Sequence, residues 1–332
     1  MDERYSRQII LEEIGKEGQE KIINKKILII GAGALGNITA NLLVRAGISI
    51  TIIDRDIIEL NNLQRQTLFN EEDIGKAKAK ILYEKLKQIN SEVKIAYAIE
   101  DVNKQNIEEF IKKHDLIIDA TDNMETRFLI NDACIKHKKP WIYGGVIGTF
   151  GMTMNIVPNK TACLRCLINS PPKIGELPTC DVMGILNTIP AIIGGFQATE
   201  AIKIIIGKDY SKNLLICDAW RQSFELVEVN KMENCICCGM KKFEFLEGEE
   251  KESIKLCGRN AIQIIPPIKK LVNFEKLEKR LKSLGNVKWD DVALQFEGEG
   301  IKIVLFRDGR AIIYGTEDVK RANSIYAKYI GL

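Results

Sequence analysis

The sequence predicts an α/β protein in which helices wind a mostly parallel β-sheet on both faces. Short apolar runs alternate with amphipathic segments from residue 26 to residue 146, the pattern of strands joined by crossover helices. A glycine-rich turn, Gly31-Ala32-Gly33-Ala34-Leu35-Gly36, separates the first apolar run from the next amphipathic segment. The 332 residues are 45% hydrophobic and 28% charged, as in soluble globular proteins, and allow one large domain and a smaller one.

The elements of the large domain follow from the period of its apolar residues. Strands are predicted where short apolar runs are bounded by charge or glycine, at residues 26–30, 49–53, 93–97, 116–119 and 141–146. Helical spacing predicts helices at residues 6–23, 34–46, 75–89, 106–113 and 125–138. Beyond Gly148 we expect a strand at 153–157, an irregular proline-containing stretch at 163–188 and a buried helix at 191–206. A closing strand pair at 214–217 and 224–229 would extend the sheet in antiparallel fashion.

The last part of the chain reads as a separate unit. We predict a first domain at residues 1–240, an acidic linker at 241–256 and a small α+β domain of unknown role at 257–332. Within that small domain, helices are expected at 274–284 and 316–329. Strands at 301–306 and 311–314 flank Asp308-Gly309, a hairpin turn signal.

Charge and hydropathy argue against several classes of partner. The net charge is only +3 and no long basic run occurs, so nucleic acid is not indicated. The charged N-terminus lacks the apolar core of a signal peptide, and the least charged stretch, 184–199, is shorter than the ~20 residues of a membrane span. We therefore expect a cytoplasmic protein. His114 and His137 both lie near lysines, so we expect them at the surface and do not expect histidine-based acid–base chemistry.

A nucleotide site is predicted where the strands end. A glycine turn between a strand and a helix lets backbone N–H groups approach phosphate, and Asp54 ends the next strand, where an acid holds ribose hydroxyls. These two features alone would suit NAD. The following segments indicate ATP with Mg²⁺ instead, because cations neutralise phosphate oxygens and a carboxylate reaches the metal. They are Asn61, Asn62, Leu63, Gln64 and Arg65, then Lys78, then Asp122 and Asn123. Taken singly, Lys78 is more often a surface lysine, and Asp122-Asn123 is more often a helix cap.

The nine cysteines of a cytoplasmic chain point to metal or reactive thiols rather than disulfides. Two C-x-x-C pairs, Cys163 with Cys166 and Cys235 with Cys238, suit a tetrahedral, structural zinc ion. Spacing leaves open whether Cys237 replaces a ligand of the second pair. Cys180 lies in the irregular stretch, where a reactive role and an inert one are both open. The other cysteines, Cys134, Cys217 and Cys257, are expected in the core.

Together with Arg4-Tyr5-Ser6-Arg7-Gln8-Ile9-Ile10, these motifs resemble, in order and spacing, a family of ubiquitin-activating-type adenylyltransferases that activate sulfur-carrier proteins, the ThiF/MoeB/HesA group. The resemblance covers about residues 4 to 239 and implies a Rossmann-like fold. It implies that Gly33 and Asp54 hold adenosine, and that Asp122 binds Mg²⁺ with Asn123 beside it. It further implies that the phosphates are bound by Asn62, Arg65 and Lys78.

The resemblance also implies partners. Arg7 would reach into the neighbouring subunit of a homodimer, the four paired cysteines would hold a structural Zn²⁺, and Cys180 would be conjugated to the carrier or transfer sulfur in some members. The substrate would be a small ubiquitin-like sulfur carrier ending in Gly-Gly, with a cysteine desulfurase or another sulfur donor as a further partner. Two alternatives stay open: an NAD-dependent oxidoreductase on the same fold, and a non-catalytic zinc-containing binding relative. The residues after Gly239 depart from the family and are too few for a rhodanese domain.

Overall fold

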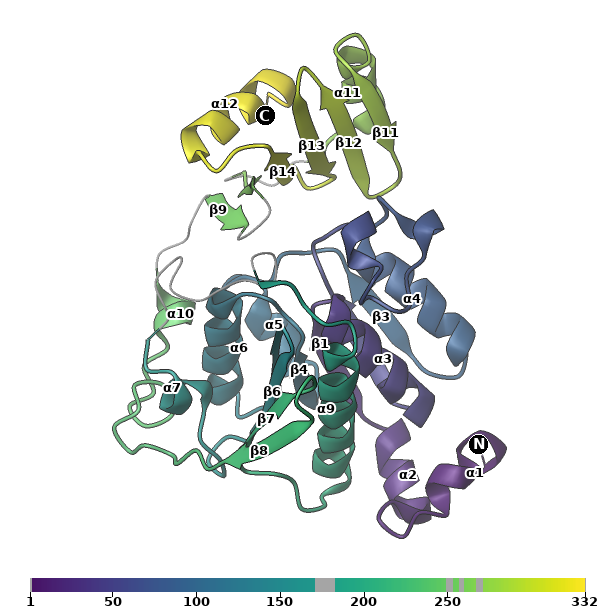
Figure 1. The fold of residues 1–332 in the computed structure, drawn as a ribbon, viewed down its shortest axis with the longest axis vertical. Coiled ribbons are helices and arrows are strands. Elements are labelled where there is room, and N and C mark those ends of the chain that lie inside the picture. Colours follow the sequence, from purple (N-terminus) through teal and green to yellow (C-terminus); the bar gives the residue numbers. More distant parts are fainter. Residues whose placement is uncertain (1, 171–182, 249–252, 257–259, 267–270, 332) are drawn as a thin grey trace. The chain divides into compact units, whose positions relative to one another are not determined.

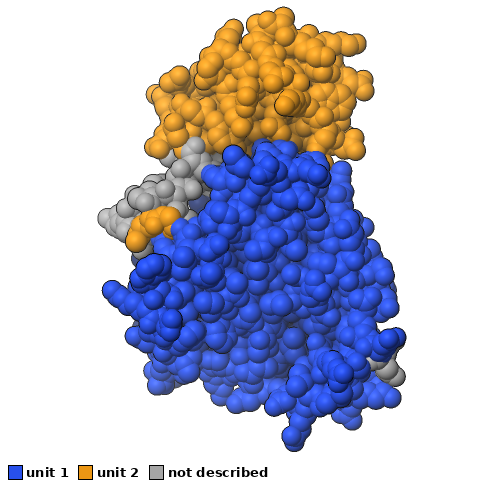
Figure 2. Space-filling model, turned by 45° about the vertical axis from the view of Figure 1, so that its right-hand side comes forward, with its two compact units in different colours: residues 1–177, 185–248 blue, residues 178–184, 249–332 orange. Residues whose placement is uncertain are grey.

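The computed structural model describes residues 2–170, 183–248, 253–256, 260–266 and 271–331 (Figure 1). They fall into two compact units (Figure 2). The first unit holds the described residues of 1–177 and 185–248, and the second holds those of 178–184 and 249–332.

The first unit is built on a sheet of eight strands among the described residues, in the order β3-β2-β1-β4-β5-β6-β7-β8. The pairs β3-β2, β2-β1, β1-β4 and β4-β5 are parallel, whereas β5-β6, β6-β7 and β7-β8 are antiparallel. This confirms the mostly parallel sheet with its antiparallel extension. The strands are β1 (Lys26–Ile30), β2 (Ser49–Ile53), β3 (Ile95–Ala98), β4 (Leu116–Asp119), β5 (Trp141–Ile147), β6 (Phe150–Ile156), β7 (Leu214–Asp218) and β8 (Ser223–Val227).

Helices cover both faces of this sheet, as a doubly wound fold requires (Figure 1). Alternate residues of β1 enter different cores: Ile27 and Ile29 pack in one, Leu28 and Ile30 in the other. The first core contains α2 (Gly15–Ile23), α3 (Ala34–Ala46), α4 (Lys78–Ile89) and α9 (Ile189–Ile206). The second contains α5 (Ile107–Lys112), α6 (Met124–Lys136) and the short α7 (Leu164–Leu167). Among the described residues α9 has the length and composition to cross a membrane, yet it packs against α3, β5 and β6 as a core helix does.

Two expectations about local structure are wrong. The helix expected at 6–23 is two helices, α1 (Asp2–Ile9) and α2, because residues 10–14 turn and Gly15 takes a left-handed φ of 61°. Helix α4 begins at Lys78 rather than at residue 75, since Gly75 has a φ of 88° and Ala77 forms a bridge with Ile57. Apolar spacing runs through both breaks, so periodicity does not reveal them.

His114 is buried, which corrects the surface position expected from its lysine neighbours. Its Nε2 lies 2.8 Å from the hydroxyl of Thr51, and its Nδ1 lies 2.6 Å from the carbonyl of Phe110. Burial lowers the pKa of His114 to about 4, so the ring is neutral near pH 7.

The second unit is a six-stranded antiparallel sheet with two helices, again counting only what is described, in the strand order β11-β12-β13-β14-β10-β9. Its strands are β9 (Ser253–Leu256), β10 (Ala261–Ile264), β11 (Asn286–Trp289), β12 (Ala293–Gly298), β13 (Ile301–Phe306) and β14 (Ala311–Tyr314). Helices α11 (Phe274–Leu281) and α12 (Val319–Tyr329) share one apolar core with the sheet. The hairpin at Asp308-Gly309 is confirmed, with Gly309 at a φ of 90°.

The interval 241–256, expected as a linker, contains two elements. Helix α10 (Glu244–Glu247) belongs to the first unit and packs on α6, where Phe245 stacks on Phe128 with ring centroids 4.9 Å apart. Strand β9 belongs to the second unit and pairs with β10. The acidic composition of this interval therefore did not reveal its short helix, which is held by the Phe245 ring and by an ion pair of Glu244 with Arg165.

Candidate functional site

At the carboxyl end of β1, the glycine turn lies close to the backbone of Ala120 and folds tightly on itself. Gly31 has a φ of 102°, and a Cβ there would lie 2.4 Å from the carbonyl oxygen of Ala120. A Cβ at Gly36 would lie 2.0 Å from the carbonyl oxygen of Gly31. Both positions therefore require glycine. A Cβ at Gly33 would meet only Gln66 Nε2, at 3.9 Å, so Gly33 instead keeps the space before the N-terminus of α3 open.

Asp54 holds this turn in place. Its two carboxylate oxygens accept the N–H groups of Ala32 and Asp56, each at 2.6 Å. Burial and the neighbouring Asp56 raise the pKa of Asp54, while Lys78 acts in the opposite direction. Each carboxylate oxygen can still accept a further hydrogen bond, so the expected contact with a ribose hydroxyl is compatible with this geometry.

The ends of β1, β2 and β4 assemble the predicted segments at one edge of the sheet. The N–H of Gly31 donates to the carbonyl of Ile53, and that of Ala120 donates to the carbonyl of Ile30. The glycine turn, Asp54 and the segment 121–123 are therefore neighbours, although they are far apart in the sequence. Ligands of doubly wound folds bind at this edge.

The 61–65 segment contains the end of a short 3₁₀ helix, η1 (Leu60–Asn62), and the residues that follow that helix. Asn62 is buried and closes the turn, with its Oδ1 accepting the N–H of Glu59 at 3.3 Å. Arg65 is partly exposed and donates from Nη1 to the carbonyl of Asn61 at 3.0 Å. Gln64 is exposed, and Leu63 packs against the first core. Lys78 opens α4 and is buried, with its Nζ 3.4 Å from Asp56 Oδ2.

Gln66 lies beside the glycine turn, and the sequence reasoning did not single it out. It is 3% exposed, it points its amide toward Gly33, and its Oε1 has no hydrogen-bond partner among the described residues. A buried polar atom without a partner is uncommon and is satisfied when a ligand supplies one. The orphaned oxygen therefore supports a ligand in front of α3. Its place two residues after Gln64 in the polar segment is the sequence signal that could have identified it.

The loop that carries Asp122 is held by a buried ion pair (Asp119 with Arg127). Arg127 Nε lies 3.2 Å from Asp119 Oδ2, and its Nη2 donates to the carbonyls of Thr121 and Gly144 at 2.7 and 3.0 Å. Asp119 Oδ1 also accepts from the N–H and hydroxyl of Thr121. The sequence reasoning missed Arg127, whose position one turn into α6 places it back over the loop. Asp122 itself is exposed at the edge.

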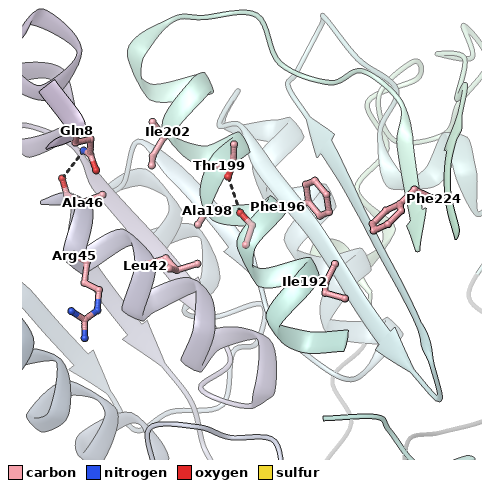
Figure 3. Close-up of a pocket in the computed structure, with 11 residues that line it drawn as sticks. Gln8, Leu42, Arg45, Ala46, Ile192, Phe196, Ala198, Thr199, Ile202 and Phe224 are labelled. Carbon is pink, nitrogen blue, oxygen red and sulfur yellow. Dashed lines mark hydrogen bonds between the residues drawn. The ribbon is translucent and has the colours of Figure 1, made fainter. Parts of the chain in front are cut away.

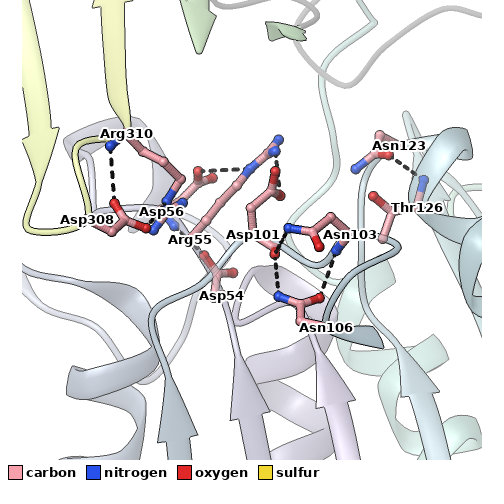
Figure 4. Close-up of polar contacts among 10 residues, drawn as sticks. All are labelled: Asp54, Arg55, Asp56, Asp101, Asn103, Asn106, Asn123, Thr126, Asp308 and Arg310. Atoms are coloured by element: carbon pink, nitrogen blue, oxygen red, sulfur yellow. Dashed lines mark hydrogen bonds and ion pairs between the residues drawn. The ribbon is translucent and has the colours of Figure 1, made fainter. Parts of the chain in front are cut away.

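Asn123 caps α6, with its Oδ1 accepting the N–H of Thr126 at 2.8 Å (Figure 4). The helix-cap explanation therefore holds for this residue. Arg7 is exposed on α1, and the next residue, Gln8, bonds to Gln19 and Ala46 at the far end of α3. Because α3 has 13 residues, Arg7 lies on the order of 20 Å from its own glycine turn. Cys180 and Cys257 lie outside the described residues.

The four paired cysteines converge. Their sulfur atoms all lie within 4.8 Å of one another, with Cys163–Cys235, Cys166–Cys238 and Cys163–Cys166 separations of 3.6, 3.5 and 3.9 Å. A tetrahedron with Zn–S bonds of about 2.3 Å has edges of about 3.8 Å, so the donors match zinc in type and spacing. Cys237 lies outside this set and accepts a hydrogen bond from Asn131 Nδ2 at 3.1 Å. The structure also places Cys134 and Cys217 in the core, as expected.

Comparison with known proteins identifies the family. Residues 5–238 match the ThiF family profile. The chain is 41% identical, over the full length of both proteins, to the sulfur carrier protein ThiS adenylyltransferase of Bacillus subtilis. It is 35% identical to the sulfur carrier protein adenylyltransferase of Thermus thermophilus, over 71% of this chain and 90% of that protein.

Other relatives cover part of this chain. The chain is 37% identical to the adenylyltransferase and sulfurtransferase MOCS3 of Culex quinquefasciatus, over 71% of this chain and 55% of that protein. The solved structure of E. coli MccB with ATP covers 72% of this chain and 75% of its own, with a TM-score of 0.64 and 24% identity, which is a likeness of fold. The profile match and the full-length identity show that the chain belongs to the ThiF family.

Proposed function

We propose that this chain catalyses the ATP-dependent adenylation of the C-terminal glycine of a small ubiquitin-like sulfur-carrier protein. The observation that carries this proposal is the full-length 41% identity to a ThiS adenylyltransferase. The geometry agrees with it, because one sheet edge gathers an open helix N-terminus, buried and exposed cations, and carboxylates. Neither alternative, the NAD-dependent oxidoreductase or the non-catalytic relative, is supported by the relatives.

The nucleotide fits the sheet edge as follows. The glycine turn and Asp54 hold the adenosine, and the free N–H groups of the first turn of α3 face the phosphates. Asn62, Arg65 and Lys78 supply hydrogen bonds and positive charge to the phosphate oxygens. Gln66, whose Nε2 lies beside Gly33 and whose buried Oε1 has no partner among the described residues, supports a ligand at this position.

Asp122 is the proposed ligand of Mg²⁺. Its exposed carboxylate provides the hard oxygen donor that this ion prefers, and Arg127 fixes the loop that carries it. When bound, Mg²⁺ would neutralise charge on the phosphates of ATP. Asn123 shapes the same loop by capping α6.

The reaction uses the ionised carboxylate of the carrier as nucleophile. A carboxylate oxygen attacks the α-phosphorus of ATP, the bond from that phosphorus to the bridging oxygen breaks, and pyrophosphate leaves. The product is an acyl-adenylate, ready for attack by a sulfur donor such as a cysteine desulfurase persulfide. No proton is removed from the nucleophile, so no general base is required and positioning and charge stabilisation are sufficient.

The zinc ion is proposed to be structural. Cys163, Cys166, Cys235 and Cys238 would all be ligands, which leaves no open position for substrate. The ion would tie the segment after β6 to the segment after β8.

A homodimer is supported by an exposed apolar groove of about 680 Å³ between α3 and α9 (Figure 3). Leu42, Phe196 and Phe224 are 39%, 38% and 56% exposed along it, so large apolar side chains face the solvent there. Gln8 also lines this groove, so a second copy seated there would lie next to Arg7. This arrangement would let Arg7 serve the partner's phosphate site, and the separation of Arg7 from its own glycine turn supports such a role.

The proposed carrier is of the ThiS type. The B. subtilis relative matches 100% of this chain, including the second unit, whereas the MOCS3 relative matches 71%. We also propose a cytoplasmic location, where such carriers and ATP are available.

The test is ATP–pyrophosphate exchange with purified chain and carrier. Exchange should require a carrier ending in Gly-Gly, be faster with a ThiS-type than with a molybdopterin-synthase carrier, and vanish when the last glycine is removed. Arg65→Ala should abolish exchange while leaving the zinc content unchanged, because the neighbouring Leu63 packs in the first core and the paired cysteines pack in the second. Retained exchange in Arg65→Ala, or exchange that ignores the carrier, would contradict the assignment.

A further inference from the structure

A row of alternating charges runs along the nucleotide edge through Asp101, Arg55, Asp56 and Lys78 (Figure 4 shows the first three). Arg55 Nη1 lies 2.8 Å from Asp101 Oδ1, and its Nε lies 3.9 Å from Asp56 Oδ1. The other oxygen of Asp56, Oδ2, lies 3.4 Å from Lys78 Nζ. These side chains are between 3% and 19% exposed, so solvent screens them weakly.

The backbone fixes both ends of this row. The N–H of Lys78 donates to the carbonyl of Asp56 at 3.0 Å, so these two residues are joined independently of their side chains. At the other end, the carbonyl of Asp101 accepts from Asn103 Nδ2 at 3.1 Å and from Asn106 Nδ2 at 2.9 Å. Arg55 therefore bridges two segments, the ends of β2 and β3, whose positions are already set.

Arg55 changes how much positive charge Lys78 can present to a phosphate. If Lys78 were the sole cation beside Asp56, the two charges would largely cancel and the ammonium would be held away from a ligand. Because Asp56 also faces the guanidinium, part of the Lys78 charge remains available. Burial alone would lower the pKa of Arg55, but Asp101, Asp56 and Asp122 raise it, so the guanidinium stays charged.

We propose that Arg55 is a positioning residue of the nucleotide site: held by Asp101, it shares Asp56 and so leaves the Lys78 ammonium available to a phosphate of ATP. This inference rests on the proposed function, since it assumes that Lys78 contacts phosphate. The inference assigns a role to Arg55, the middle residue of Asp54-Arg55-Asp56. Of these three residues, only Asp54 is otherwise proposed to contact the nucleotide.

The test compares Arg55→Met, Arg55→Lys, Asp56→Asn and the double variant Arg55→Met/Asp56→Asn. Arg55→Met should raise the KM for ATP in pyrophosphate exchange on the order of tenfold, as one lost charge near the site would, with kcat changed much less. Arg55→Lys should stay close to the parent protein because it keeps the charge. Asp56→Asn alone should not raise the KM for ATP. The double variant should recover most of the lost affinity, because it also removes the carboxylate that would otherwise hold the Lys78 ammonium.

Two readouts separate this inference from the proposed function. Calorimetric binding of ATP tests Arg55 even without a carrier, whereas carrier-dependent exchange by the parent protein tests the function. Lys113→Met is the matched control, since it removes one positive charge from the exposed pair with Glu109 on α5. Unchanged ATP affinity in Arg55→Met would overturn the inference. So would a double variant as weak as the single one, which would mean that Arg55 acts by touching ATP itself or by supporting the fold.

Discussion

Replacing Arg127 by methionine should destabilise the first unit strongly and in a pH-dependent way. The substitution keeps much of the side-chain volume but leaves the carboxylate of Asp119, which is 0% exposed, without its guanidinium. It also removes the donor that serves the carbonyls of Thr121 and Gly144. Removing one partner of a buried ion pair costs about 3–5 kcal/mol of unfolding free energy.

The pH dependence has a definite sign. Burial already raises the pKa of Asp119, with Arg127 opposing the rise. Without Arg127 the folded-state pKa increases further above the unfolded value, so the folded state binds a proton more readily. The loss of stability should therefore be largest at high pH and diminish as the pH falls through the raised pKa.

Urea unfolding of the parent protein, Arg127→Met and Arg127→Met/Asp119→Asn at about pH 8 and about pH 5.5 measures this effect. The double variant should regain part of the lost stability at the higher pH, because a neutral amide replaces the unpaired carboxylate. A loss of stability that is equal at both pH values and unaffected by Asp119→Asn would refute the electrostatic reasoning.

Three further predictions concern the turn, the metal and the buried histidine. Gly36→Ala should abolish pyrophosphate exchange and lower the melting temperature, since its Cβ would meet backbone at 2.0 Å, whereas Gly33→Ala should fold normally but raise the KM for ATP. Calorimetry alongside exchange kinetics tests this pair, and a well-folded Gly36→Ala would contradict it. Cys166→Ser should lose bound zinc and melt at lower temperature, whereas Cys237→Ser should retain one zinc per chain by metal analysis; the reverse pattern would reassign the ligands. His114 has a pKa of about 4 when folded, so the unfolded state binds more protons below about pH 6.5 and stability falls by up to about 3 kcal/mol toward pH 4. His114→Gln should flatten that part of the stability profile, and an unchanged slope would exclude His114 as its source.

Much of the first unit could be predicted because its signals are local. The strand at 116–119 and the helix at 34–46 agree with β4 and α3 to the residue. The strand is a continuous apolar run, the helix has a regular helical spacing of apolar residues, and each is bounded by residues that end such elements. The turn at Gly15 and the late start of α4 could not be predicted, because left-handed glycines leave the apolar spacing unchanged. The burial of His114 was not predicted for a related reason: its partner Thr51 lies in β2, far from it in the sequence.

The sequence by itself determined the donor types and their order: the glycine turn, Asp54, the 61–65 segment, Lys78, Asp122 and the two cysteine pairs. Those features depend on short spacing and on the chemistry of single side chains, which a linear chain records directly. Only the tertiary structure decided which of them meet. It grouped the strand ends at one edge, set Arg127 behind Asp119 and closed four sulfurs to a tetrahedral spacing. Parallel pairing and crossover helices bring together residues that are distant in the sequence. The structure also separated Arg7 from its own glycine turn, because the neighbouring Gln8 bonds to the far end of α3.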